Sequence, residues 1–232
     1  MSYRVLARKW RPQSFDSLIG QGPIVTALSN ALTEGKIAQA YLFSGIRGVG
    51  KTTAARLLAK ALNCEQGPTA TPCNQCRQCI DITRGSDLDV LEIDAATHSK
   101  VEQVRELTES LRYGPARDRY KVVVIDEIHR LSRAAFDALL KIVEEPPDHL
   151  VFIFATTEIE AVPVTILSRC QEFHFRRVPS DVVAAHLAKI AADEGITASD
   201  ASMRLVARAG EGSVRDAVAL FDQLATFGSG TV

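Results

Sequence analysis

The chain has 232 residues, of which 24% are charged and 46% hydrophobic, and its formal net charge is −1. This size and composition are typical of a globular protein of one or two domains. A neutral total excludes a global basic field for nucleic acid, although a local basic face is compatible with it. No apolar run reaches the roughly 20 residues that a membrane span needs, and no apolar segment follows the basic N-terminus as in a secretory signal. We therefore expect a cytoplasmic protein without a membrane partner.

Over most of the chain, short hydrophobic strands alternate with amphipathic helical patterns. The predicted elements are a helix at 24–32, a strand at 40–43, a helix at 53–62, a strand at 89–93, a helix at 101–111, a strand at 121–125, a helix at 132–144 and strands at 150–154 and 172–175. Ser132 can cap the helix at 132–144, and Pro146 and Pro147 end it. This alternation predicts an α/β fold with a parallel sheet covered by helices on both faces.

The pattern changes after Pro179. Helical segments near 180–194, 199–209 and 213–226 follow one another with no strand between them. We therefore expect two domains, a nucleotide-binding domain at 1–178 and a small helical domain at 179–232.

The segment from Gly45 to Thr52 fits the pattern G-x-x-x-x-G-K-[ST] between a predicted strand and a predicted helix. Its glycines let the backbone curl so that N–H groups point at phosphate oxygens, and the helix start adds its dipole. Lys51 reaches the β- and γ-phosphates, and the hydroxyl of Thr52 ligates magnesium. The expected ATP contacts are Gly45, Arg47, Gly48, Val49, Gly50, Lys51, Thr52 and Thr53. A chance glycine-rich turn would not combine this spacing with both neighbouring elements.

Two acids close the strand at 121–125. Asp126 is placed to complete the shell of Mg²⁺, and Glu127 to polarise the water that attacks ATP. One acid alone would be a common helix cap, but two acids downstream of a phosphate loop favour catalysis. Thr157, after the next strand, can orient that water or sense the γ-phosphate. His129 is equally compatible with an ordinary hydrogen-bonding histidine and with a role in coupling.

Four of the five cysteines fall within sixteen residues. Cys64, Cys73, Cys76 and Cys79 can close a tetrahedral Zn²⁺ site with no position left for water, which predicts a structural metal. An iron–sulfur cluster and free buried thiols are the alternatives. This insertion should form a knob on the flank of the sheet. Cys170 stands apart and is expected to be a small buried side chain.

These motifs together resemble the tau/gamma family of bacterial DNA polymerase III, whose members are AAA+ ATPases and act as motors of the sliding-clamp loader. The matching segments are 3–12 (YRVLARKWRP), the phosphate loop, the four cysteines, 126–132 (DEIHRLS), 139–141 (LLK), 144–147 (EEPP) and 168–170 (SRC). The resemblance runs over the whole chain. The cysteine insertion and the SRC segment are far more specific to the family than the phosphate loop.

The resemblance assigns further roles around the nucleotide. Arg169 would be an arginine finger acting in trans, on ATP held by a neighbouring subunit, whereas the residues alone allow equally a structural arginine paired with a carboxylate. Arg215 would be a second sensor on the helical lid, with Val214 near the base. The adenine and ribose side would be lined by Arg11, Pro12, Leu18 and Ile19.

The resemblance also implies contacts with the DNA backbone at a helix start. The matching residues are His98, Ser99, Lys100, Arg105 and Lys141, and a solvated helix face is the alternative for each. His98 departs from the basic residue expected there.

The expected partners are the delta and delta-prime subunits, further copies of the chain, the sliding clamp and primed DNA. The family's third domain, the collar of the loader, is not found within the sequence. We therefore expect this chain alone to be monomeric, to bind nucleotide and to turn it over slowly. Two other functions are alternatives. One is a nucleotide-gated recruitment module with negligible ATPase activity, which intact Lys51, Thr52, Asp126 and Glu127 disfavour. The other is a branch-migration helicase, which has no four-cysteine insertion.

Overall fold

The computed structural model describes residues 5–97 and 101–232. Five parallel strands form one sheet in the order β2-β3-β4-β1-β5. The strands are β1 (Ala40–Ser44), β2 (Val90–Asp94), β3 (Lys121–Asp126), β4 (Leu150–Thr156) and β5 (Gln171–His174). The connection from β1 to β2 passes over β4 and β3. The strand order therefore reverses beside β1, the position where open α/β sheets bind ligands.

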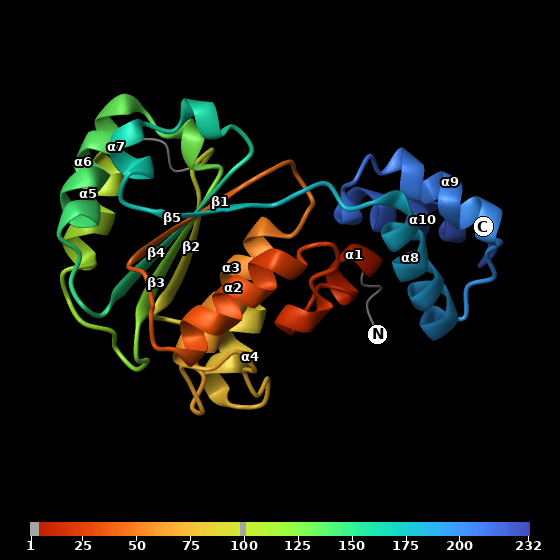
Figure 1. The fold of residues 1–232 in the computed structure, drawn as a ribbon, viewed down its shortest axis with the longest axis horizontal. Helices are drawn as coiled ribbons and strands as arrows, with labels where there is room; N and C mark the ends of the chain where they lie inside the picture. Colours follow the sequence, from red (N-terminus) through yellow and green to blue (C-terminus); the bar gives the residue numbers. More distant parts are fainter. Residues whose placement is uncertain (1–4, 98–100) are drawn as a thin grey trace.

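Helices cover both faces of the sheet, as the alternating pattern predicted (Figure 1). The helices of this part are α2 (Gly22–Thr33), α3 (Lys51–Asn63), α4 (Arg77–Arg84), α5 (Val101–Ser110), α6 (Arg133–Glu144) and α7 (Val164–Leu167). Helices α2, α3 and α4 contribute to one core layer and α5, α6 and α7 to the other. Because strand side chains alternate, Phe43 and Ile153 point into the first layer, whereas Leu42 and Phe154 point into the second.

The helix caps follow from the sequence. Ser132 accepts a hydrogen bond from the backbone N–H of Ala135 at 3.2 Å, which confirms it as the cap of α6. The short α4 and α7 were not among the predicted elements. Within the described residues, no helix combines the length and the apolar character that crossing a membrane requires.

A separate helical bundle follows β5, drawn in blue in Figure 1. It consists of α8 (Ser180–Glu194), α9 (Asp200–Ala209) and α10 (Val214–Phe227), with a core of its own. The N-terminal helix α1 (Leu6–Lys9) also packs there: Leu6 is part of this core, and its backbone N–H donates to Asp222 at 3.0 Å. Helix α1 therefore packs against the lid, although the sequence grouped this segment with the nucleotide-binding domain.

Candidate nucleotide site

The phosphate loop lies between β1 and α3, at the carboxyl end of the central strand. Gly45 and Gly48 have φ angles of 138° and 77°, which side-chain-bearing residues rarely adopt. A Cβ at Gly45 would collide with the carbonyl oxygen of Phe175, and one at Gly48 with the hydroxyl of Ser213. Both glycines are thus required by conformation and by the close approach of neighbouring residues.

Lys51 begins α3 and is only 5% exposed. Its ammonium group donates to the carbonyl oxygens of Gly45 at 2.7 Å and Ile46 at 3.0 Å, so it folds back over the loop. Burial lowers the pKa of Lys51, while the nearby Glu127 and Asp126 carboxylates act in the opposite direction. A phosphate oxygen placed in the loop would offer this cation an anionic acceptor in place of neutral carbonyls.

The next residue, Thr52, reaches the end of β3. Its hydroxyl donates to Asp126 Oδ2 at 2.8 Å. In an octahedral Mg²⁺ shell, two adjacent oxygen ligands lie about 2.9 Å apart. The two oxygens therefore have the chemistry and the separation that a shared magnesium ion needs.

Glu127 has a left-handed backbone conformation, with φ of 50° and ψ of 47°. Its N–H donates to Asp126 Oδ1 at 3.0 Å. Its carboxylate oxygen Oε2 accepts hydrogen bonds from the N–H of Thr157 at 3.1 Å and from the Thr157 hydroxyl at 2.9 Å. The structure thus brings together the acid from the end of β3 and the threonine that follows β4, the two residues that the sequence analysis assigned to the attacking water.

The lid touches the loop directly. The backbone N–H of Arg215 donates to the carbonyl of Gly48 at 3.2 Å. Ser213 caps α10 by accepting from Asp216 at 3.2 Å, which fixes the helix start against the loop. Val214 packs on the lid core and Arg215 is exposed. The backbone of Arg215, the second-sensor candidate, therefore lies beside the phosphate loop.

The proposed base side is formed by the segment after α1. Arg11 donates from Nε to the hydroxyl of Thr53 at 3.2 Å. Burial, followed by repulsion from Arg56, lowers the pKa of Arg11. Leu18 is buried, and its Cδ2 lies 3.2 Å from the position of a Cβ on Gly50.

Other residues considered for the nucleotide differ in their surroundings. Ile19 packs on the lid core and Pro12 is half-buried. Within the loop, Val49 is buried whereas the side chain of Arg47 is exposed. Arg47 can therefore contribute its backbone N–H to phosphate while its side chain remains in solvent.

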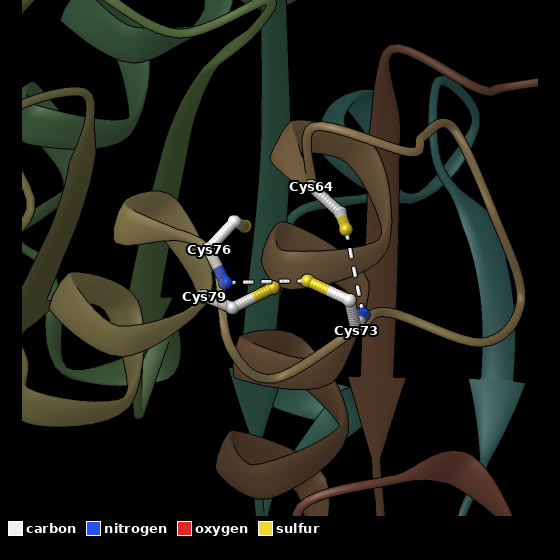
Figure 2. A group of neighbouring side chains, drawn as sticks. All are labelled: Cys64, Cys73, Cys76 and Cys79. Carbon is white, nitrogen blue, oxygen red and sulfur yellow. Dashed lines mark hydrogen bonds between the residues drawn. The ribbon is translucent and has the colours of Figure 1, made fainter.

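The four clustered cysteines meet at the end of α3 and the first turns of α4 (Figure 2). Their sulfur atoms all lie within 4.8 Å of one another. Sulfurs around tetrahedral zinc are about 3.8 Å apart, so a small contraction would complete the site. The N–H groups of Gln75 and Cys76 lower the pKa of Cys73 to about 6, whereas burial raises that of Cys79. Donor chemistry and geometry both fit zinc.

Arg169 lies just before β5, at the amino ends of the strands, whereas the phosphate loop lies at their carboxyl ends. Gln171, two residues after Arg169, pairs with Tyr41 of β1. The phosphate loop starts after Ser44, about 10 Å from Tyr41 along β1. The guanidinium of Arg169 binds Glu144 Oε1 at 2.6 Å and the carbonyl of Thr165 at 2.7 Å. In Figure 1, α7 accordingly lies on the left, away from the loop that joins β1 to α3.

The DNA candidates are only partly placed. Arg105 on α5 and Lys141 on α6 are exposed on two helices that pack against each other. His98, Ser99 and Lys100 lie outside the described residues. Cys170 is half-buried, and burial raises its pKa to about 12.

Two contacts at these sites were not predicted, those of Thr157 with Glu127 and of His129 with the ends of β3 and β4. A third contact, between Arg169 and Glu144, is the carboxylate pairing that the sequence allowed as the alternative to an arginine finger. Each joins residues between 2 and 30 positions apart, and only the strand order would have revealed most of them. The repeated acids at 144–145 were the one sequence signal for a partner of Arg169.

Comparison with known proteins places these features in one family. A family described as "DNA polymerase III, delta subunit" matches residues 20–179, and one described as "DNA polymerase III clamp loader subunit, ATPase lid domain" matches residues 182–230. DNA polymerase III subunit tau of Escherichia coli is 53% identical over 100% of this chain and 36% of its own length. Subunit tau/gamma of Haemophilus influenzae is 50% identical over 98% of this chain and 33% of its own.

The chain belongs to the tau/gamma family of bacterial DNA polymerase III clamp-loader subunits. It spans about a third of the length of these tau and tau/gamma relatives. Among solved structures, the RuvB Holliday junction branch migration motor of Thermotoga maritima superposes on this tau/gamma-family chain with a TM-score of 0.68 at 22% identity, covering 95% of this chain and 67% of RuvB. That likeness concerns the fold alone and agrees with the predicted parallel α/β sheet followed by a small helical domain.

Proposed function

We propose that this chain is the ATP-driven motor of a sliding-clamp loader, which loads the clamp onto primed DNA. The observation that carries the proposal is the joining of Thr52 to Asp126 and of Glu127 to Thr157 beside the phosphate loop. A recruitment module without turnover would need the loop but not the positioned glutamate. The names of the E. coli and H. influenzae relatives support a role in DNA polymerase III.

ATP would bind with its phosphates in the loop from Gly45 to Gly50. Backbone N–H groups and Lys51 would neutralise the β- and γ-phosphates. Thr52 and Asp126 would hold Mg²⁺, which supplies positive charge that offsets the charge developing on the phosphate oxygens. The base would lie against Leu18 and the segment from Arg11, on the side that faces the lid.

Hydrolysis would begin with a water molecule oriented by Glu127. The water oxygen bonds to the γ-phosphorus while the bond to the bridging oxygen breaks, and ADP leaves with that electron pair. Glu127 accepts a hydrogen bond and then one proton from the attacking water, and Thr157 holds its carboxylate in place.

The site would be completed by a neighbouring subunit. Since Arg169 lies at the amino end of the sheet, it is far from its own loop, and its partly exposed pair with Glu144 could be exchanged for ATP held by the next copy. A guanidinium at the γ-phosphate stabilises the transition state. Arg215 would approach the same nucleotide from the lid of its own chain.

Further partners follow from the proposed loader. The delta and delta-prime subunits and further copies of this chain would form the ring, and the clamp and primed DNA would be its substrates. Arg105 and Lys141 would contact backbone phosphates without reading sequence. Slow turnover by the isolated chain is expected because its ATP receives no arginine from a neighbouring copy.

The decisive experiment replaces Glu127 with Gln in the full-length subunit of a reconstituted loader. Because the amide cannot accept the water proton, turnover should fall by about 10²-fold or more while ATP binding is retained. Steady-state phosphate release and fluorescent-ATP titration measure the two quantities. Unchanged turnover would contradict a motor, and loss of ATP binding would contradict the role given to Glu127.

The cysteines would hold one structural Zn²⁺. Elemental analysis should find about one equivalent of zinc per chain, lost on Cys76→Ser together with stability, since metal binding and local folding are coupled. Cys170→Ser serves as the control and should retain the metal. Iron in its place, or no metal in freshly purified protein, would contradict the assignment.

A further inference from the structure

His129 lies in the short turn after Glu127, with a side chain only 7% exposed. Its ring is placed between the ends of β3 and β4. Nδ1 lies 3.0 Å from the hydroxyl of Thr156 and 3.3 Å from Glu127 Oε2, and Nε2 lies 3.5 Å from Glu158 Oε1. The ring thus contacts the carboxylate to which hydrolysis was assigned above.

The surrounding hydrogen bonds decide which atom of the ring donates. The Thr156 hydroxyl donates its one hydrogen to the carbonyl of Glu158 at 3.1 Å and accepts from the N–H of Glu158 at 3.0 Å. With that hydrogen on the Glu158 carbonyl, and with the acceptor Glu127 Oε2 also beside Nδ1, the hydrogen of the remaining contact is assigned to His129 Nδ1. The same Nδ1 also lies 3.3 Å from Glu127 Oε2, so the N–H dipole favours the negative carboxylate without a hydrogen bond to it.

Two hydrogen-bond donors and one neighbouring ring N–H therefore surround one oxygen of Glu127. Oε2 faces the N–H and hydroxyl of Thr157 and the Nδ1–H of His129. Within the described part of the chain, Oε1 makes no hydrogen bond to protein and is available for water. Fixing one carboxylate oxygen leaves the other with a defined direction, which an incoming water molecule needs.

His129 also connects the glutamate to the phosphate loop. The carbonyl oxygen of Thr156, whose hydroxyl contacts the ring, accepts the N–H of Gly45 at 3.2 Å. A short path thus runs from the first glycine of the loop through Thr156 and the imidazole to Glu127. The left-handed backbone of Glu127 requires such support from its surroundings, because a non-glycine residue adopts it at an energetic cost.

We propose that His129 is a positioning residue for ATP hydrolysis: its ring, bonded to Thr156 and in contact with Glu127 Oε2, holds Glu127 in register with the phosphate loop. The proposal rests on the motor function given above. His129 does not touch ATP in this scheme, so its removal should change the rate of hydrolysis and leave the affinity for ATP intact.

The test compares two substitutions of similar size in the full-length subunit of a reconstituted loader. His129→Asn keeps an N–H donor near the place of Nδ1, whereas His129→Leu has a methyl group there. We expect His129→Leu to lower kcat about tenfold, the effect of losing one well-placed hydrogen bond, with the ATP Kd within threefold of the parent. His129→Asn should restore kcat to within about threefold of the parent.

Several results would overturn the proposal. They are a kcat of the Leu variant within twofold of the parent, an Asn variant no better than Leu, or an ATP affinity that falls in parallel with kcat. If the Leu variant fails to fold, His129→Gln takes its place, since its amide lies near Nε2 and should not restore kcat. His149→Leu, at the other edge of the sheet, controls for the general loss of a histidine.

Failure of this inference can be told apart from failure of the motor function. If Glu127→Gln abolishes turnover while His129→Leu does not, only the role of His129 is refuted. If Glu127→Gln itself leaves turnover intact, the motor function fails and His129 has no catalytic carboxylate to position.

Discussion

At the carboxyl edge of the sheet, the residues assigned to nucleotide chemistry are already bonded to one another. Thr52 bonds to Asp126, Glu127 to Thr157, and Lys51 is 5% exposed. At the amino edge, Arg169 and its partner Glu144 have side chains that are 34% and 42% exposed. The carboxyl edge is thus a preorganised site. At the amino edge, the guanidinium of Arg169 is in an ion pair whose partner can be exchanged.

This difference indicates which groups act on ATP bound to the same chain and which act on ATP bound to a neighbour. A guanidinium kept in an exposed ion pair can transfer to a phosphate at little cost, because such pairs contribute little stability. Buried groups that satisfy each other are costly to move. The carboxyl edge therefore suits binding within the chain, and the amino edge suits an action on a neighbour.

The largest expected effect is on turnover, and it comes from a substitution at the amino edge. Arg169→Ala should lower turnover in the assembled loader by about 10³-fold, as for other arginine fingers, with ATP affinity unchanged. Phosphate release and ATP titration measure the two. Arg112→Ala, another exposed arginine, is the control. A large loss of ATP affinity in the isolated chain would place Arg169 at its own nucleotide instead.

Mixed assemblies sharpen this prediction. In a loader that combines Arg169→Ala and Glu127→Gln subunits, some sites join an intact glutamate to a neighbour's intact arginine. Such mixtures should recover part of the turnover that each variant alone lacks. If mixing recovers nothing, the two residues do not act across one interface.

A smaller effect is expected for Lys51→Ala at the carboxyl edge. Loss of a charge-assisted bond to the phosphates should weaken ATP binding by about 10- to 100-fold, even in the isolated chain. Titration with a fluorescent nucleotide measures this, with Lys36→Ala as the control. Equal affinities for Lys51→Ala and Lys36→Ala would refute the proposed binding geometry.

The smallest effect concerns the ion pair itself. Glu144→Gln should change the free energy of unfolding by less than about 1 kcal/mol, because both partners are partly exposed. Urea denaturation of the isolated chain measures it. A loss of several kcal/mol would show that Arg169 is a structural residue, and the contrast between the two edges would disappear.

Much of the fold could be predicted because its signals are local. Runs such as 121–125 and 150–154 are long and apolar enough to specify buried strands, and Ser132 specifies a cap. Helix α7 was missed because it is a single turn, whose stability comes from packing rather than from a periodic pattern.

The site could be predicted only in part, for a related reason. Gly45 to Thr52 is contiguous in sequence, so its geometry follows from one motif. The contact of Thr157 with Glu127 depends instead on β3 lying beside β4, and that of Leu6 with Asp222 spans 216 residues. Tertiary arrangement decides both, and no local pattern encodes it.

The N-terminal segment has a mechanical consequence. Trp10 bonds to Glu194 of the lid at 2.8 Å, and the chain then continues to Leu18, which lies against Gly50 of the phosphate loop. This strap is anchored to the lid at one end and to the sheet domain at the other. A rotation of the lid would pull on the strap and shift the wall against which the base is proposed to lie. The orientation of the lid and the affinity for the nucleotide would then change together.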